Sequence, residues 1–228
     1  MRDQFGRAID YMRVSVTDRC NLRCVYCMPA AGVPFVPHEE ILSFDEIARI
    51  CRIGAELGIT KLKLTGGEPL VRRGLPDLLG MLKRIPGIEQ VTLTTNGTLL
   101  KEQINELVSN GLNSVNISID TLDPERYREV TRGGSVEKAW EGLDAAAGFP
   151  GLRVKVNCVP LQGAEDEEYI RLALLAKEGK ADVRFIEMMP IGMGKVFSGR
   201  SKEEIYSILK QVYGEPEAYD GRLGNGPA

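Results

Sequence analysis

The sequence predicts an α/β fold: an incomplete (β/α)6 TIM-like barrel with parallel strands, open on one side. Segments rich in β-forming residues recur along the chain. They lie near residues 11–17, 60–65, 90–95, 114–120, 152–159 and 181–187. Helical patterns fill most intervals between them, and strands separated by helices are expected to pair in parallel. Because these strands fall short of the eight of a closed barrel, we expect the barrel to stay open.

Two of the intervening helices carry clear start signals. Ser43 and Glu46 form a predicted capping box, and a helix is expected over about residues 43–57. Its inward stripe is predicted to be Ile47, Ile50, Cys51 and Gly54. Ser201 and Glu204 open a similar helix after the last strand. Its apolar face is predicted to be Ile205, Ile208, Leu209 and Val212.

Each predicted strand alternates polar with apolar side chains, so one face of the sheet is polar. That face carries Arg13, Ser15, Thr17, Lys63, Thr65, Thr92, Thr94, Asn116, Ser118, Asp120, Arg153, Lys155 and Asn157. In a curved parallel sheet this face must line a lumen, because a dry, unpaired polar group costs several kcal/mol. A half-exposed antiparallel sheet would also alternate, but the intervening helices disfavour it. We therefore expect a polar ligand, with its site where the strands end.

Composition excludes several classes of function. The 29 Lys and Arg residues against 32 Asp and Glu give a net charge of −3. This balance argues against a nucleic-acid partner or an anionic membrane surface. No stretch approaches the roughly 18 apolar residues of a membrane span, so we expect a cytoplasmic protein. Five cysteines, three of them within eight residues, do not resemble a secreted disulfide framework.

The three clustered cysteines indicate a metal centre. Cys20, Cys24 and Cys27 follow the first strand with the spacing C-x3-C-x2-C. Iron–sulfur clusters are held by four ligands, so three thiolates from one loop leave one iron open to a cofactor or substrate. The alternative is a zinc site completed by His38, the only histidine. The two remaining cysteines fall on apolar stripes and are predicted to be core thiols: Cys51 and Cys158.

With Tyr26 just before its last cysteine, this loop resembles the signature of the radical S-adenosylmethionine (SAM) superfamily. The resemblance implies a [4Fe–4S] cluster whose open iron binds the amino and carboxylate groups of SAM. An electron from the cluster then splits SAM into methionine and a 5′-deoxyadenosyl radical. The turn TGGEP, which holds the methionine amino group in that superfamily, ends the second strand. Its glycines, Gly66 and Gly67, allow a ligand close approach.

An ordered set of motifs narrows the resemblance to the MoaA family, the GTP 3′,8-cyclases of molybdenum-cofactor biosynthesis. The set is RVSVTDRCNLRCVYCMP, TGGEPLVRR, LTTNG, NISIDT, KVN and RFIEMMP, and it covers nearly all 228 residues. It implies conversion of GTP to (8S)-3′,8-cyclo-7,8-dihydro-GTP after removal of the ribose 3′ hydrogen. The implied SAM contacts are Tyr26, Gly67, Ser118 and Met189. The implied GTP contacts are Arg13, Lys63, Thr94, Lys155 and Arg184. No catalytic residue is assigned beyond the cluster ligands.

Family members also hold a second [4Fe–4S] cluster through three cysteines of a C-terminal segment, but this chain has no cysteine after Cys158. We therefore expect residues 1–195 to form the radical SAM partial barrel and residues 196–228 to begin a truncated C-terminal segment. Such a chain should cleave SAM but cyclise GTP poorly. The resemblance further implies an electron donor of unknown identity, a homodimer and a downstream biosynthetic enzyme as partners.

Other interpretations stay open at this point. A naturally short radical SAM enzyme could act on a peptide or an RNA, although the acidic balance disfavours RNA. A zinc-stabilised binding module would carry no chemistry. The lumen cations could instead form internal ion pairs or reach solvent at the strand ends.

Overall fold

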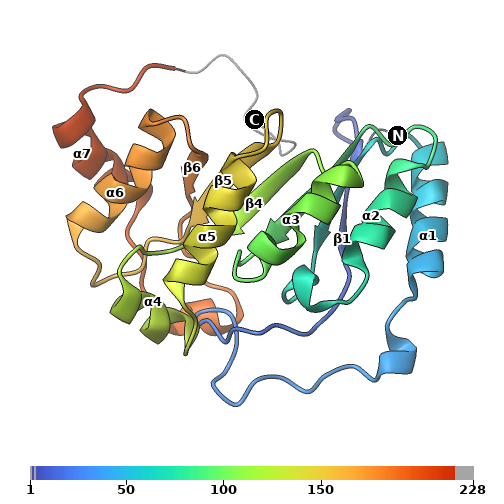
Figure 1. Ribbon diagram of the computed structural model, residues 1–228. Helices are drawn as coiled ribbons and strands as arrows, with labels where there is room; N and C mark the ends of the chain where they lie inside the picture. Colours follow the sequence, from blue (N-terminus) through green and yellow to red (C-terminus); the bar gives the residue numbers. More distant parts are fainter. Residues whose placement is uncertain (1, 3, 219–228) are drawn as a thin grey trace.

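The computed structural model describes residue 2 and residues 4–218 (Figure 1). Its centre is one parallel sheet whose strand order, β1-β2-β3-β4-β5-β6, follows the sequence. The strands are β1 (Tyr11–Ser15), β2 (Lys61–Thr65), β3 (Gln90–Thr95), β4 (Ser114–Ser118), β5 (Arg153–Cys158) and β6 (Asp182–Phe185). Each forms inside a segment predicted to be a strand. The predicted α/β class with parallel strands is confirmed.

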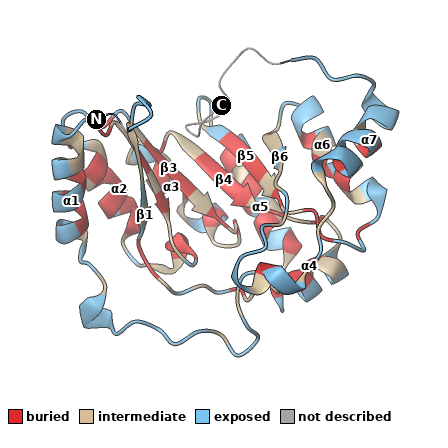
Figure 2. Cartoon of the chain, turned by 180° about the vertical axis from the view of Figure 1, so that it is seen from behind, coloured by how far each residue is buried: buried red, intermediate tan, exposed pale blue. Residues whose placement is uncertain are grey.

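Helices fill the intervals between the strands and cover one face of the sheet (Figure 1). They are α1 (Phe44–Glu56), α2 (Leu75–Lys83), α3 (Leu100–Ser109), α4 (Pro124–Thr131), α5 (Val136–Ala147), α6 (Asp166–Lys177) and α7 (Lys202–Tyr213). Short 3-10 turns are η1 (His38–Glu40), η2 (Pro69–Val71) and η3 (Gly192–Val196). Seen from behind, the sheet lies in front of the helices, and its other face is uncovered (Figure 2).

The alternation along the strands separates a core from a polar face. Apolar strand residues such as Leu62, Leu64, Leu93 and Ile117 are fully buried and belong to the main hydrophobic core. The same core includes the two predicted core thiols, Cys51 and Cys158, which are both inaccessible to solvent. Side chains of the opposite parity point away from this core. The predicted polar face therefore exists on the side that no helix covers.

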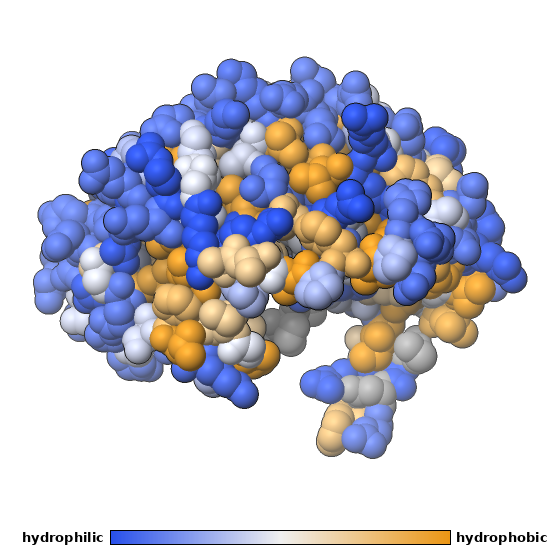
Figure 3. Space-filling model, turned by 90° about the horizontal axis from the view of Figure 1, so that it is seen from below, coloured by the Kyte–Doolittle hydropathy of each residue, from blue (hydrophilic) through white to orange (hydrophobic). Residues whose placement is uncertain are grey.

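The sheet is an arc rather than a closed barrel. Within residues 4–218, β1 pairs only with β2 and β6 only with β5. Helix α7 packs on α6 and contributes Ile205 and Ile208 to the shared core. Viewed from the end where the strands finish, the molecule is a curved body around a hollow (Figure 3). The prediction of an open partial barrel is confirmed.

Helix boundaries follow the predicted caps. The capping boxes Ser43/Glu46 and Ser201/Glu204 are both present at the starts of α1 and α7. The predicted stripes were wrong at one position each, because Ile50 and Val212 are exposed. Only a narrow stripe of each helix is buried, and these side chains fall just beyond it. The Gly-rich end, residues 221–228, lies outside the described residues.

No helix among the described residues combines the length and apolar character needed to span a bilayer.

We expect Ile47→Ala and Ile50→Ala, two changes on one helix, to differ strongly in stability. Ile47 is 2% exposed and Ile50 46% exposed. Truncation at 47 should lower the free energy of unfolding by about 2–5 kcal/mol, and truncation at 50 by less than about 0.5 kcal/mol. Urea unfolding of the two variants measures this. Equal losses would show that the buried face of α1 is assigned wrongly.

Candidate active site

The cysteine loop leaves the carboxyl end of β1 and is fixed to a helix more than a hundred residues away. The amides of Arg23 and Val25 donate to the carbonyls of Thr131 (3.0 Å) and Val130 (2.9 Å) at the end of α4. Arg132 follows in a left-handed conformation with φ 55°. Its guanidinium donates to the carbonyl of Arg23 at 3.0 Å and to that of Met28 at 2.7 Å. The loop is therefore anchored on both sides of its cysteines.

The residues of this loop fit an iron–sulfur cluster. The thiols of Cys20 and Cys24 are partly buried and that of Cys27 is exposed. Burial raises the pKa of all three, and for Cys24 it combines with the charges of Asp120 and the other two thiols to raise the pKa to about 12. The Leu22 amide already donates to Cys20 Sγ at 3.4 Å. Because the ligands are thiolates, cluster binding must release these protons.

A single metal ion finds no comparable ligand set. Among the described residues, no group of three or more His, Cys, Asp or Glu side chains is placed to hold one ion. This does not conflict with a cluster, because each thiolate of a cluster binds a different iron atom. His38 lines a separate cavity of about 540 Å³ with Phe44 and Arg72, and no cysteine lines that cavity. The zinc alternative therefore has no support in this structure.

The Gly-Gly turn after β2 lies flat against the chain that leads into the cysteine loop. The amide of Gly67 donates to the carbonyl of Thr17 at 2.7 Å, and that of Glu68 to the carbonyl of Arg19 at 2.8 Å. A Cβ on Gly67 would collide with the Arg19 carbonyl oxygen and lie 2.8 Å from that of Asp18. We expected these glycines to admit a ligand. The close approach seen here is to the protein's own backbone.

A buried carboxylate joins this turn to the next strand end and to the cysteine loop. Glu68, 1% exposed, accepts hydrogen bonds from the Thr95 hydroxyl (2.7 Å) and the Asn96 amide (2.6 Å). The Asn96 side chain donates to Asn21 Oδ1 at 2.8 Å, and Asn21 Nδ2 donates to the Thr98 hydroxyl at 2.9 Å. These contacts hold three loops in fixed relation to one another.

A second buried carboxylate, Asp120, holds the aromatic residue of the cysteine loop. The Tyr26 hydroxyl donates to Asp120 Oδ2 at 2.6 Å, and the Val159 amide donates to Oδ1 at 2.8 Å. Burial raises the pKa of Asp120 to about 6, while these two donors oppose the shift. Ser118, a predicted SAM contact, ends β4 two residues earlier. Sequence reasoning placed Asp120 on the lumen face but missed its role as the partner of Tyr26.

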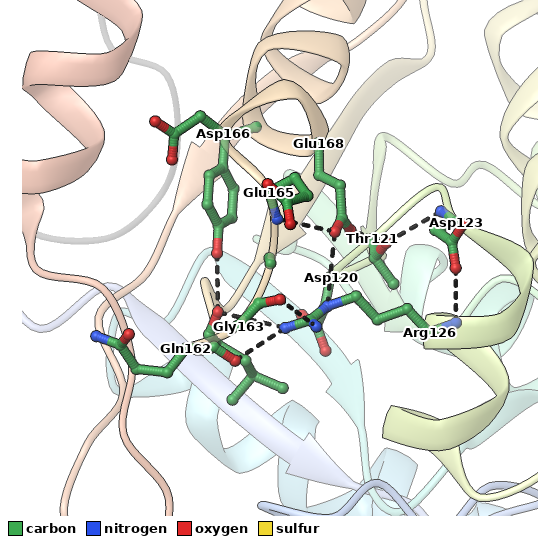
Figure 4. Close-up of polar contacts among 12 residues, drawn as sticks. Asp120, Thr121, Asp123, Arg126, Gln162, Gly163, Glu165, Asp166 and Glu168 are labelled. Carbon is green, nitrogen blue, oxygen red and sulfur yellow. Dashed lines mark hydrogen bonds and ion pairs between the residues drawn. The ribbon is translucent and has the colours of Figure 1, made fainter.

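Arg126 of α4 fixes the neighbouring loop after β5 (Figure 4). Its guanidinium donates to the carbonyls of Gly163 (2.8 Å) and Gln162 (3.0 Å) and lies 3.7 Å from Glu168. Glu168 also accepts a short hydrogen bond from Thr121, which follows Asp120. Helix α4 is thus tied to the cysteine loop at its carboxyl end and to the β5–α6 loop near its amino end.

Strand pairing arranges the polar face in layers. The first layer joins Arg13, Lys63, Thr92, Ser114 and Arg153 across five strands. The second joins Thr94, Asn116, Lys155 and Asp182. The third joins Ser118, Asn157 and Arg184. Successive layers are about 6.6 Å apart along the strands. The third layer lies nearest the carboxyl ends, where the cysteine loop leaves β1.

A cavity of about 310 Å³ occupies the part of the lumen farthest from the cysteines. Its lining is Tyr11, Lys63, Gln90, Thr92, Asn113, Ser114, Asn116, Arg153, Lys155 and Arg184. These described residues include four cations and no carboxylate. Lys155 is 3% exposed, and its Nζ makes no hydrogen bond to any described residue; Asp182 Oδ2 lies 3.9 Å away. Asp182 is thus shared at long range by Lys155 and Arg153, and this excess of positive charge favours an anionic ligand.

Mutual repulsion of these cations is visible in the ionisation of Lys63. Burial lowers its pKa to about 8, and the charges of Arg184, Arg13 and Lys155 contribute to the same direction. The pKa of Lys155 is also lowered, by burial and then by Arg184, while Asp182 opposes the change. No carboxylate contributes to this shift, and Lys63 Nζ lies 5.9 Å from the centroid of the Tyr11 ring. An anion bound among them would reverse these shifts.

The structure does not bring every predicted site residue together. Lys63, Lys155 and Arg184 line the cavity, whereas Thr94 and Arg13 flank it on neighbouring strand positions. Met189, in the loop after β6, is 63% exposed and lies outside the cavity lining. Arg153 was missed as a candidate, although its parity with Lys155 was the signal that could have found it. Roles for all of these residues stay predictions.

Sequence comparison agrees with this geometry. The family model described as the Radical SAM superfamily matches residues 14–176. A GTP 3′,8-cyclase of Heliobacterium modesticaldum is 47% identical over 228 residues, covering 100% of this chain and 68% of that protein. A protein of the same name from Pelotomaculum thermopropionicum is 49% identical, covering 100% of this chain and 71% of that protein. The chain therefore spans about two thirds of the length of these relatives.

Solved structures with the same fold are more distant in sequence. Streptococcus suis SuiB bound to S-adenosylmethionine gives a TM-score of 0.69 at 20% identity, covering 89% of this chain and 46% of that chain. Methylornithine synthase (PylB) gives a TM-score of 0.67 at 19% identity, covering 90% and 62% of the two chains. At this level of identity the likeness supports the fold alone.

We expect Gly67→Ala to disturb the cysteine loop, because its Cβ has no room beside Arg19. The change should lower the free energy of unfolding by about 1–3 kcal/mol and reduce the iron retained after anaerobic reconstitution. Gly148→Ala is the matched control, since its Cβ would lie 3.5 Å from the nearest atom, an ordinary contact. Wild-type stability and iron content in Gly67→Ala would refute the constraint.

Proposed function

The chain belongs to the radical SAM superfamily, and within it to the GTP 3′,8-cyclase family, and from this premise we propose how it binds SAM and GTP. The protein is an enzyme with a [4Fe–4S] cluster and SAM as cofactors. We propose that it acts on GTP to form (8S)-3′,8-cyclo-7,8-dihydro-GTP, a step of molybdenum-cofactor biosynthesis. The observation that carries the proposal is the cysteine loop placed above a lumen with an excess of cations.

The cofactors supply the radical, and the chain supplies position. When bound, the cluster and SAM provide a 5′-deoxyadenosyl radical able to remove the ribose 3′ hydrogen of GTP. Cys20, Cys24 and Cys27 would hold the cluster. Tyr26, Gly67, Ser118 and Met189 would contact SAM. Tyr26 is oriented for this by Asp120, and Ser118 stands in the layer nearest the cysteine loop.

The triphosphate of GTP would occupy the cationic cavity. A triphosphate carries about four negative charges at neutral pH. The predicted contacts Arg13, Lys63, Lys155 and Arg184, together with Arg153, place five positive charges around this space, of which Asp182 offsets one. Thr94 would add a neutral hydroxyl. Lys63 presents a point charge, where an arginine would offer a bidentate contact. With the phosphates in this cavity, the ribose would lie toward the cysteine loop. Holding the ribose 3′ hydrogen close to the radical would then supply much of the rate enhancement.

Several features implied by the family resemblance stay predictions. These are the second [4Fe–4S] cluster, the electron donor, the homodimer and the downstream enzyme. The cytoplasmic location, expected from the composition, is also a prediction. The division into residues 1–195 and 196–228 is likewise our proposal. Its support is that β6 ends at Phe185 and the chain then leaves the sheet for η3 and α7.

Radical initiation can be tested without GTP turnover. We expect the anaerobically reconstituted protein to form 5′-deoxyadenosine from SAM when dithionite is added. Cys24→Ser should abolish this, and Cys51→Ser, which alters a core thiol, should not. Chromatographic detection of 5′-deoxyadenosine in the three samples is the measurement. If the wild-type protein forms none, radical initiation by this chain is excluded. Labelled GTP in the same mixture reports cyclisation, which we expect to be poor.

The low pKa of Lys63 makes GTP affinity depend on pH. Free Lys63 loses its proton near pH 8, and a bound triphosphate raises this pKa, so binding takes up a proton. Between pH 7 and 9.5 the affinity should therefore fall, by up to about tenfold per unit above pH 8. Lys63→Arg should flatten the profile, because arginine stays protonated. Isothermal calorimetry with GTP tests this, and an equal fall in Lys63→Arg would exclude Lys63 as its source.

A further inference from the structure

Tyr127 is a buried tyrosine of α4 whose hydroxyl is unused. The residue is 2% exposed, and its hydroxyl forms no hydrogen bond with any described residue. The other fully buried tyrosine, Tyr169, donates to the carbonyl of Leu161 at 2.9 Å. Burying a hydroxyl without a partner is unfavourable, so an unpartnered one needs an explanation.

Charged groups of the cysteine loop and of two strand ends act on the Tyr127 phenol. Burial raises the pKa of this phenol, and the charges that add to the shift are those of Cys24, Asp120, Glu68 and Cys20, in that order. These groups come from the cysteine loop and from the ends of β4 and β2, so they surround the phenol from separate elements. The hydroxyl therefore keeps its proton. The carboxyl end of the same helix is hydrogen-bonded to the cysteine loop, through Thr131 to Arg23 and Val130 to Val25, so the phenol lies beside that loop.

The phenol ring is held in this position by its neighbours. A Cβ on Gly134 would lie 2.9 Å from both Tyr127 Cε1 and Leu22 Cδ2, so the glycine lets the ring meet the cysteine loop. The Thr131 hydroxyl donates to the Tyr127 carbonyl at 2.6 Å. Arg126, the preceding residue, ties the same turn of α4 to the β5–α6 loop (Figure 4). These contacts fix the backbone of this turn and pack the ring, which is 2% exposed, against the cysteine loop.

We propose that the Tyr127 hydroxyl donates a hydrogen bond to a sulfur atom of the [4Fe–4S] cluster held by Cys20, Cys24 and Cys27, and so raises its reduction potential. The inference rests on the proposed function, because it requires the cluster. Hydrogen bonds to cluster sulfurs are among the factors that set reduction potentials. A donor stabilises the more negative, reduced cluster, so its removal makes reduction harder. Tyr127 thus makes the cluster easier to reduce by the electron that starts the reaction.

The test compares Tyr127→Phe with wild type in the anaerobically reconstituted protein without SAM. Redox titration followed by electron paramagnetic resonance (EPR) should show a more negative midpoint for the variant. We expect a reduced-to-oxidised ratio about tenfold lower at a given potential, which corresponds to about 59 mV for a one-electron couple. After exchange into D2O, the reduced cluster of the wild-type protein should show one strongly coupled deuteron in its hyperfine spectrum. That deuteron should be missing from the spectrum of Tyr127→Phe.

Tyr169→Phe is the matched control, because it deletes a hydroxyl that is bonded elsewhere. It should lower the midpoint of urea unfolding and leave potential and deuteron coupling unchanged. Tyr127→Phe should leave the unfolding of the cluster-free protein unchanged, since no bond is lost. An unshifted potential with the deuteron retained in Tyr127→Phe would overturn the inference and leave the proposed function standing. Wild-type protein that yields no [4Fe–4S] EPR signal would instead overturn the proposed function.

Discussion

The register of the parallel sheet is the constraint on which the rest of the molecule depends. Because side chains alternate along a strand, a slip of one residue in β2 would turn Lys63 into the helix-covered core and Leu64 into the lumen. Each fully buried leucine favours the observed register by about 1.5–3 kcal/mol. Leu62, Leu64 and Leu93 are completely buried. The apolar contacts that stabilise the fold therefore also fix the positions of the cations that line the lumen.

In the loops at the carboxyl ends of the strands, hydrogen bonds of buried polar groups, rather than apolar packing, fix the conformation. Glu68, Asp120 and Arg126 each join loops that are distant in sequence through several hydrogen bonds. Removing one member would leave its partners buried and unpaired, at about 1–3 kcal/mol for each. The loop that carries the cysteines is held by Asp120 through Tyr26, by Asn96 through Asn21, and by Arg132 at the end of α4. This explains how a segment with little regular structure can present three thiols in a fixed arrangement.

The sequence alone predicted the features that depend on the alternation of side chains along a strand or on a local helix cap. Strand alternation predicted both the lumen and its cations, and Ser43 with Glu46 predicted the start of α1. Helical periodicity could not reveal how wide a stripe of the helix is buried, so Ile50 was placed inside wrongly. Nor could it pair Tyr26 with Asp120, because that contact depends on how two loops meet in space. The unpartnered hydroxyl of Tyr127 has no sequence signal at all.

The cations on the three layers of the lumen affect the stability of the folded chain. Positive charges that repel one another lower the free energy of unfolding of the unliganded chain. A polyphosphate that neutralises them binds only the folded form, and at a hundred times its dissociation constant it adds about 2.7 kcal/mol to the free energy of unfolding. Such a ligand therefore stabilises the folded state in addition to filling the binding site. The concentration of the nucleotide therefore sets both how much of the site is filled and how stable the folded chain is.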